Sequence, residues 1–395
     1  MNTVNPIMRQ GGITVLKKKI VIIIFSLMLF ITTLSLLSPD RKNSDLEYRS
    51  LAQFPSADIQ EVLNGTYFQE LETYQLDQLV FRDSILKSSS KIDKLLLKSI
   101  RKNHFISNSG YILEFEDYQE QTLSSLQESL DKPISNLQNL KNVSEKSGGQ
   151  FIFIDIPQKY DFHNELFPNY FATNTMHKLE YNNTLRTQAD KASVQTISGS
   201  DVFLKNGLLE PYYKTDNHYT ADASLLIYQE LLETINDPRI QTRPISNYER
   251  IVYESPFIGN NSRTMADTSY SKGEIFYYLK PQNQSLPKYK RYEDSSPSDE
   301  PVMIADETIS LYGNYMNGDK ANTVIKTKRD NLPKILFIGD SFANALEYLS
   351  IYDFNEVHSL DLRSYKGNVY EYIEKNKFDV IVFVRNTQLN LIENE

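Results

Sequence analysis

The stretch ILFIGDSFANALEYL, residues 335–349, constrains the fold more than any other part of the sequence. It begins with an apolar run, which is typical of a strand buried on both faces of a parallel sheet. The run breaks at Gly339, Asp340 and Ser341, and the residues after the break have the apolar spacing of an amphipathic helix. A buried strand that passes directly into a helix is the repeating unit of α/β proteins.

The same alternation recurs along the chain and predicts an α/β fold with a mainly parallel sheet. Thr220 is a plausible N-cap for one of the connecting helices. Further strands are expected near residues 150–157, 194–197, 356–362 and 378–386, and helices at 119–147, 221–235 and 369–376.

Near the N-terminus, residues 20–37 form an uncharged apolar run of about the length needed to cross a bilayer core. Three lysines at 17–19 precede it, so the positive-inside rule keeps residues 1–19 in the cytoplasm. The alternative is a cleaved signal peptide, but the run lacks a small-x-small site at its end and exceeds the usual apolar core of such peptides. We expect a transmembrane signal anchor that places the rest of the chain outside the membrane.

Past the anchor, the polar residues 38–57 are typical of an extended linker. Residues 58–395 are expected to form one extracytoplasmic domain, which begins with two helices within 58–100 and a hairpin at 104–115. A Tyr-, Ser-, Pro- and Asn-rich insertion of short strands and loops is expected at about 237–331.

Composition excludes several classes of function. The net charge is −9 and no concentrated basic surface shows in the sequence, which argues against a nucleic-acid partner. The chain has no cysteine, which excludes disulfides, thiolate catalysis and cysteine-ligated metals. Its five histidines do not stand at the spacing of metal ligands. We therefore predict neither a metal site nor a cofactor.

Ligands bind at the carboxyl ends of parallel strands, so polar residues at those ends are candidates for function. Ser341 is the first. A serine that leaves a strand and opens a helix has a backbone N–H that can stabilise an oxyanion while the hydroxyl attacks an acyl carbon. The alternative is that Ser341 is only the N-cap of the helix, and this segment alone does not separate the two.

Asp216 and His218 are the second candidates. Residues two apart in an extended segment project to the same side, so the carboxylate can orient the imidazole, as the acid of a catalytic triad does. The alternative is an exposed loop with Asp216 as a charge beside the helix. Lys159, after the predicted strand at 150–157, is the third candidate: it either places a cation beside the substrate or is a structural lysine.

These segments resemble the conserved blocks of a known family. GDSF, residues 339–342, resembles the serine block of the SGNH hydrolases, and DNHYT, 216–220, resembles their acid–histidine block in a shorter form. The acid–histidine block comes first, which is the circularly permuted order of the alginate O-acetyltransferase group. The closest resemblance is to the related family named for an Asp-His-His-Trp (DHHW) motif, found in envelope proteins of Gram-positive bacteria. Further agreement extends from about residue 47 to the C-terminus over EYRSLAQFP, YQLDQLVFRD, GYILEF and IDIPQKYDFH.

The chain departs from this family at several positions. Asn217 stands where the family has its second histidine and Tyr219 where it has tryptophan, but the Asp-x-His spacing and an aromatic ring survive. The chain has no clear Gly-Asn-Asp block, whose asparagine helps to form the oxyanion hole in the family. Gly259 and Asn260 in FIGNNS occupy a plausible place and are candidates for that role.

Arg385 and Asn386, at the end of the last predicted strand, are expected near the edge of the site. An arginine there binds a saccharide carboxylate or phosphate, or pairs with a surface acid. Both possibilities stay open at this point.

The resemblance implies an SGNH-hydrolase-like three-layer α/β/α fold and acyl transfer by a Ser341, His218 and Asp216 triad. It implies a membrane-anchored O-acetyltransferase that acts on a cell-envelope or exported polysaccharide, with a multi-pass membrane acyltransferase as the partner that supplies acyl groups. Two alternatives stay open: a carbohydrate esterase with the same triad, and a catalytically degenerate polysaccharide-binding or assembly protein. The sequence does not separate transferase from esterase, because they differ in which nucleophile reaches the acyl-enzyme.

Overall fold

The computed structural model describes residues 6–47, 49–115, 130–169, 171, 175–305 and 308–384. It divides into two compact units, Met1–Lys98 and Ser99–Glu395. The division falls inside the range 58–395 that the sequence predicts as one domain, so the predicted domain boundaries stay a prediction.

The first unit begins with the long helix α1, Pro6–Leu36. Its segment Lys18–Leu36 has a mean hydropathy of 2.4 and is long and apolar enough to cross a membrane. The predicted linker carries a short antiparallel ladder of β1, Asn43–Ser44, and β2, Arg49–Ser50. Residues of this segment therefore pair with one another instead of running as a free extended chain.

Three helices follow where the apolar spacing of the sequence predicts two. They are α2, α3 and α4, with bounds Ile59–Asn64, Thr66–Asp77 and Arg82–Leu95. Gly65 separates the first two because it has a left-handed φ of 88°, which ends one helix and redirects the chain. Asp77 at the end of α3 accepts hydrogen bonds of 2.6 and 2.8 Å from the guanidinium of Arg49, which ties the ladder to this helix.

The second unit contains an eight-stranded sheet in the order β11-β10-β12-β14-β13-β15-β6-β7. The five strands from β14 to β7 are parallel, and β12, β10 and β11 extend the sheet in antiparallel pairings. The strands are β6 Gln150–Asp155, β7 Gln195–Ser198, β10 Lys290–Glu293, β11 Ser296–Ser298, β12 Asn322–Lys326, β13 Lys334–Gly339, β14 Glu356–Asp361 and β15 Val380–Val384. This confirms the prediction of a mixed α/β fold with a large, mostly parallel sheet.

Smaller sheets and the helices complete the unit. The predicted hairpin is observed, with an additional strand, as β3 Ile100–Arg101, β4 His104–Ile106 and β5 Ile112–Glu114, and the predicted insertion contributes β8 Tyr248–Val252 paired with β9 Tyr277–Pro281. The helices are α6 Asp131–Lys146, α7 Lys159–Phe162, α8 Thr175–Lys191, α9 Gly199–Lys205, α10 Ala221–Ile235, α11 Asn260–Thr264, α12 Asn344–Ser350 and α13 Val369–Asn376. Pro133 lies in the first turn of α6, and the part of the predicted helix at 119–129 lies outside the described residues.

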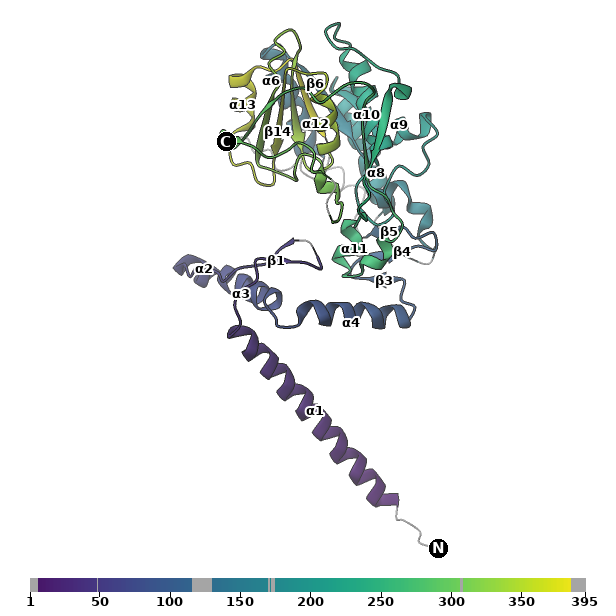
Figure 1. The fold of residues 1–395 in the computed structure, drawn as a ribbon, viewed down its shortest axis with the longest axis vertical. Helices are drawn as coiled ribbons and strands as arrows, with labels where there is room; N and C mark the ends of the chain where they lie inside the picture. The colour runs from purple at the N-terminus through teal and green to yellow at the C-terminus, as the bar shows by residue number, and fades with distance from the viewer. Residues whose placement is uncertain are drawn as a thin grey trace. The chain divides into compact units, whose positions relative to one another are not determined.

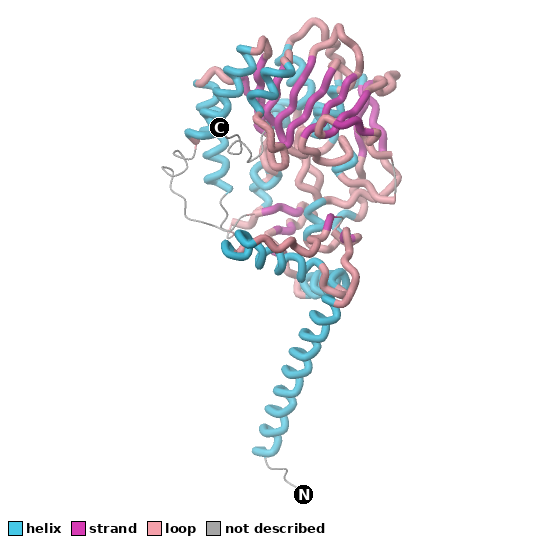
Figure 2. Tube along the Cα trace, turned by 90° about the vertical axis from the view of Figure 1, so that its left-hand side faces the viewer, coloured by secondary structure: helices cyan, strands magenta, loops and turns pink. Residues whose placement is uncertain are grey.

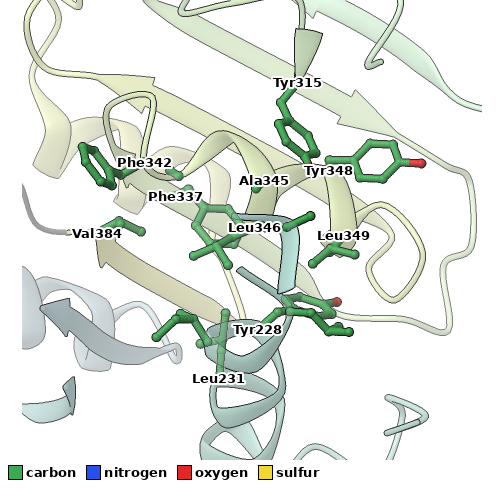
Figure 3. Close-up of a cluster of buried hydrophobic side chains, with 14 of the residues drawn as sticks. Tyr228, Leu231, Tyr315, Phe337, Phe342, Ala345, Leu346, Tyr348, Leu349 and Val384 are labelled. Atoms are coloured by element: carbon green, nitrogen blue, oxygen red, sulfur yellow. The ribbon is translucent and has the colours of Figure 1, made fainter. Parts of the chain in front are cut away.

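Helices cover both faces of the sheet (Figures 1 and 2). Successive side chains of a strand point to opposite faces, so Phe337 of β13 belongs to one hydrophobic cluster and Leu336 to the other. The first cluster includes residues of α10 and α12, and the second includes residues of α6, α8 and α13. Figure 3 shows side chains of β13, α10 and α12 meeting in the first cluster, among them Tyr228 and Leu346.

The parallel strands end at one edge of the sheet, which positions the candidate site. Gly339 at the end of β13 pairs in register with Asp361 of β14, and Asp155 of β6 pairs with Ser198 of β7. Ser341 follows β13, an inner strand of this parallel set. Its side chain therefore starts from the edge where α/β proteins bind ligands.

Candidate active site

Ser341 lies in the turn between β13 and α12. The helix begins at Asn344 with Ala343 at its N-cap position, so Ser341 precedes the helix and is not its cap. Its hydroxyl Oγ lies 2.7 Å from Nε2 of His218, which comes from a segment 123 residues earlier in the chain. The hydroxyl is thus paired with an imidazole instead of with the helix backbone.

Asp216 and His218 lie on the segment that leads into α10. Oδ1 of Asp216 is 2.6 Å from Nδ1 of His218 and also accepts a 3.0 Å hydrogen bond from the backbone N–H of His218. The expected same-side projection of residues two apart is therefore observed. Thr220 caps α10 as expected, accepting a hydrogen bond from the N–H of Ala223. The structure brings the three predicted residues, Asp216, His218 and Ser341, into one hydrogen-bonded chain.

The environment of Asp216 keeps its carboxyl ionised. The side chain is fully buried, and burial by itself raises its pKa. The charge of His218, hydrogen bonds from its ring and backbone, and a 2.6 Å hydrogen bond from the N–H of Asn260 to Oδ2 outweigh burial. Together they lower the pKa of Asp216 to about 2. A carboxylate at neutral pH can orient the imidazole and stabilise its protonated form.

Aromatic rings hold the imidazole of His218 in place. The ring of Tyr312, from a short 3-10 helix Tyr312–Asn314, stacks on it in parallel with centroids 3.8 Å apart. Phe342, next to the serine, lies 4.9 Å away on centroids. Tyr219, which replaces the tryptophan of the motif, is fully buried and donates its hydroxyl to the carbonyl oxygen of Phe342. Tyr219 therefore connects the histidine segment to the serine turn.

Lys159 lies beneath the loop that carries Asp216, and its ammonium group points to backbone carbonyl groups of that loop. Only 3% of the residue is exposed, and Nζ donates to the carbonyl oxygens of Tyr213, Lys214 and Asp216 at 3.1, 2.9 and 2.6 Å. Burial lowers the pKa of Lys159 to about 8 against the opposing charges of Asp216, Glu274 and Glu114. Of the two readings of this residue, the geometry favours the structural lysine.

Gly259 and Asn260 also contact the Asp216 loop. A side chain at Gly259 would place Cβ 2.2 Å from the carbonyl oxygen of Thr215, so only glycine fits this approach. The N–H of Gly259 donates to Ser271, and that of Asn260 to Asp216, so both backbone amides are already engaged. The side-chain amide of Asn260 donates to Oδ1 of Asn217 at 3.3 Å and is the one group of this pair left as an oxyanion candidate.

Two further residues of this loop environment were not predicted from the sequence. The carboxylate of Glu274 accepts hydrogen bonds from the backbone N–H groups of Lys214 and Thr215. The hydroxyl of Ser271 lies 2.9 Å from the Thr215 hydroxyl. Both residues lie in the low-periodicity insertion, where isolated Ser and Glu residues carry no sequence signal that marks them as loop supports.

Arg385 and Asn386 lie outside the described residues. Among the residues that the structure describes, no group of three or more His, Asp or Glu side chains could hold a metal ion. A serine paired with a histidine that is itself paired with a buried carboxylate is an arrangement for nucleophilic acyl transfer.

Solved structures share this fold at low sequence identity. Bacillus cereus PatB1 superposes with a TM-score of 0.57 at 20% identity, over 73% of this chain and 97% of that chain for the structure with a sulfonyl adduct. A DHHW family protein from Eubacterium siraeum superposes with a TM-score of 0.55 at 17% identity, over 75% and 94% of the two chains. These matches confirm the predicted resemblance at the level of the fold.

A weaker match is the O-acetyltransferase domain of Pseudomonas putida AlgJ, with a TM-score of 0.45 at 11% identity, over 75% of this chain and 94% of that chain. This likeness is too weak to support an inference. No protein-family model and no curated protein sequence matches the chain.

Proposed function

We propose that the chain is a membrane-anchored, extracytoplasmic O-acetyltransferase that acts on a cell-envelope or exported polysaccharide. The observation that carries the proposal is the hydrogen-bonded chain from Asp216 through His218 to Ser341, with distances of 2.6 and 2.7 Å. The resemblance of the two motif blocks to the alginate O-acetyltransferase and DHHW group supports the acetyl and polysaccharide parts, and the fold shared with a DHHW family protein supports that resemblance.

Each proposed step uses a group of the triad. Oγ of Ser341 attacks the acetyl carbonyl carbon, and Nε2 of His218 takes the hydroxyl proton. When the tetrahedral intermediate collapses, the bond to the donor's leaving group breaks and His218 returns the proton to that group. A sugar hydroxyl then gives its proton to His218, attacks the acetyl-serine and releases Ser341, which regains the proton. Asp216 stays ionised and holds the imidazole throughout.

The oxyanion donor is assigned to the side-chain amide of Asn260. Its Oδ1 accepts a 3.3 Å hydrogen bond from the guanidinium of Arg263, and its Nδ2 donates to Asn217, the residue between Asp216 and His218. One amide donor of this kind is worth about 10²–10³-fold in turnover in serine hydrolases. Arg385 and Asn386 are proposed to bind the polysaccharide at the edge of the site.

The anchor and the partner follow from the same proposal. The apolar segment of α1 supports a single membrane span with the cytoplasmic N-terminus at the lysine-rich end. A soluble acyl donor would not reach a site on the far side of the membrane. A multi-pass membrane acyltransferase that delivers acetyl groups is therefore the proposed partner.

The test uses the purified full chain in detergent with a chromogenic acetyl ester, with and without acceptor oligosaccharides. The proposal expects ester cleavage that acceptor sugars stimulate, with acetyl appearing on the sugar by mass spectrometry. Release to water without stimulation by any acceptor would instead make the chain an esterase. No turnover, or turnover that survives Ser341→Ala, would remove the enzymatic proposal altogether.

The Ser341→Ala variant also separates attack from helix capping. We expect turnover to fall by about 10⁴-fold or more, whereas stability should change by less than about 0.5 kcal/mol because Ser341 is not the cap of α12. An aryl sulfonyl fluoride gives an independent readout, since PatB1 has been solved with a sulfonyl adduct. It should add one sulfonyl group to the wild type and none to Ser341→Ala.

A further inference from the structure

We infer that α4 is an amphipathic helix that lies on the membrane surface and binds anionic lipid headgroups. The inference rests on the proposed membrane anchor and adds a second, peripheral contact with the same bilayer. It concerns only the first unit, Met1–Lys98, and is independent of the acyl-transfer chemistry.

The first observation is an apolar stripe along α4 that the protein does not cover. Ile85, Ile92 and Leu95 stand at positions i, i+7 and i+10, which fall on one face of a helix, and they are 45%, 55% and 82% exposed. Leu96 and Leu97, directly after the helix, are 62% and 89% exposed. Exposed leucines and isoleucines gathered in a stripe mark an interaction surface.

The second observation is the charge beside the stripe. Lys91 is exposed beside Leu95, about one turn away, and Lys87 is exposed on the side of the helix away from Ile85. Residues 82–98 hold five basic and two acidic side chains, a net charge of +3 in a chain whose net charge is −9. An apolar face flanked by lysines fits an anionic lipid surface, since the apolar side chains enter the headgroup region and the ammonium groups meet the phosphates. The exposed apolar residues of α2 and α3, such as Phe68, have acidic neighbours, Glu70 and Glu72, and do not share this pattern.

The third observation is where α4 starts. The backbone N–H of Val80, just before α4, donates to Oγ of Ser35 in the last turns of α1 at 2.9 Å. The guanidinium of Arg41 donates to Asp83 in the first turn of α4 at 3.3 Å. These contacts hold the start of α4 beside the end of the proposed span, which is the level of the membrane surface. Within the first unit, Figure 1 draws α4 crossing the direction of α1 instead of continuing it.

The absence of cysteine from the sequence allows a direct test, because a single introduced cysteine becomes the only labelling site. Full chains carrying Ile92→Cys, Lys87→Cys or Leu29→Cys are labelled with an environment-sensitive fluorophore. They are then reconstituted into vesicles of phosphatidylcholine with phosphatidylglycerol that contain lipids with a nitroxide near the headgroup or, for position 29, lipids with a nitroxide deep in the acyl chain. Ile92→Cys reports the stripe, Lys87→Cys is the matched control on the polar face, and Leu29→Cys reports the span.

We expect lipid quenching at position 92 to exceed that at position 87 by roughly twofold or more, because interfacial helices bury only their apolar face. Replacing Lys87, Lys91 and Lys94 by glutamine in the Ile92→Cys chain should return quenching at position 92 to the level found with phosphatidylcholine alone. Equal quenching at 92 and 87 while position 29 is quenched would overturn the inference and leave the anchor intact.

Two other results would also overturn it. Protection of position 92 from iodide in water without quenching by lipid would show that protein, either the rest of the chain or a partner, covers the stripe. No lipid quenching at position 29 would remove the proposed anchor, and the inference with it. Neither result bears on ester turnover by Ser341, so the proposed acyl-transfer chemistry is tested separately from the proposed contacts with the membrane.

Discussion

The ammonium of Lys159 donates a 2.6 Å hydrogen bond to the backbone carbonyl oxygen of Asp216, the carboxylate that orients His218. With the carbonyl oxygens of Tyr213 and Lys214, it has three acceptors for its three N–H groups. Lys159 is thus a positioning residue for the loop that bears the catalytic acid. This relationship has consequences for both activity and stability.

We expect Lys159→Met to lower kcat by about 10²-fold, since a small displacement of a catalytic group is worth that much. The KM for a small acetyl ester should change little, because the buried ammonium does not reach the substrate. Wild-type kcat should fall as pH rises through about 8, the pKa of Lys159, because the neutral amine has two donors for three carbonyl oxygens. The check is the pH profile of ester turnover, with Lys205→Met on α9 as the exposed-lysine control.

The stability of the wild type relative to Lys159→Met should rise with pH, whereas the kcat of the wild type falls. The folded pKa of Lys159 is about 8 and its ordinary value is 10.5, so between these values the unfolded chain binds more protons at this site. The contribution of Lys159 to the free energy of unfolding therefore increases as pH rises through this range. This contribution is measured as the free energy of unfolding of the wild type minus that of Lys159→Met, obtained from denaturation at each pH. A difference that does not vary from pH 8 to 10.5 would contradict the assigned burial.

The Asp216→Asn variant tests the acid of the triad. The amide no longer favours the imidazole tautomer that accepts the serine proton, and kcat should fall by about 10⁴-fold. The folded pKa of Asp216 is about 2 and its ordinary value is 3.8, so the carboxylate contributes stability above about pH 3.8 that is lost as pH falls towards 2. The contribution is on the order of 2 kcal/mol. Acid denaturation of both chains measures it, and parallel curves would count against the paired carboxylate.

Of the five parallel strands, β6, β13 and β15 were predictable as short apolar runs, as in the run that ends at Gly339, whereas β7 and β14 carry more polar residues and a weaker signal. The pairing of Asp216 with His218 was predictable from their spacing, and the order of the motif blocks joined them to Ser341. The direction in which the Lys159 side chain points was not predictable from the sequence. It depends on α7 starting at this residue, which turns the side chain under a loop 55 residues away. Sequence position at a strand end does not specify which way a side chain points.

Gly259 tests how tightly the Asp216 loop is packed. In Gly259→Ala the new Cβ would lie 2.2 Å from the carbonyl oxygen of Thr215, so the loop or α11 has to move. We expect a loss of about 1–3 kcal/mol in stability, with a fall in kcat that exceeds any change in KM. Gly313→Ala is the matched control, since its Cβ would meet its nearest atom at 4.0 Å. If both variants behave like wild type in denaturation and turnover, the close approach at Gly259 does not constrain the site.

Tyr312 contacts the triad but was not predicted from the sequence, because it lies in the Tyr-rich insertion without a motif around it. Its ring stacks on His218 at 3.8 Å, an aromatic contact worth about 0.5–1.5 kcal/mol. In Tyr312→Ala the imidazole loses the stacked ring. We expect kcat to fall by about 3–10-fold or more, since about 1.4 kcal/mol of activation free energy is a tenfold change in rate. Tyr312→Phe keeps the ring and should stay near wild type.

Thermal denaturation of both Tyr312 variants shows whether the fold survives. If Tyr312→Ala and Tyr312→Phe are equally stable, a difference between their kcat values reflects the loss of the ring and not partial unfolding. If Tyr312→Phe loses as much turnover as Tyr312→Ala, the hydroxyl and not the stacked ring matters, and Tyr312 then acts through Tyr219. If neither variant loses turnover, the imidazole is held by its hydrogen bonds to Asp216 and Ser341 alone.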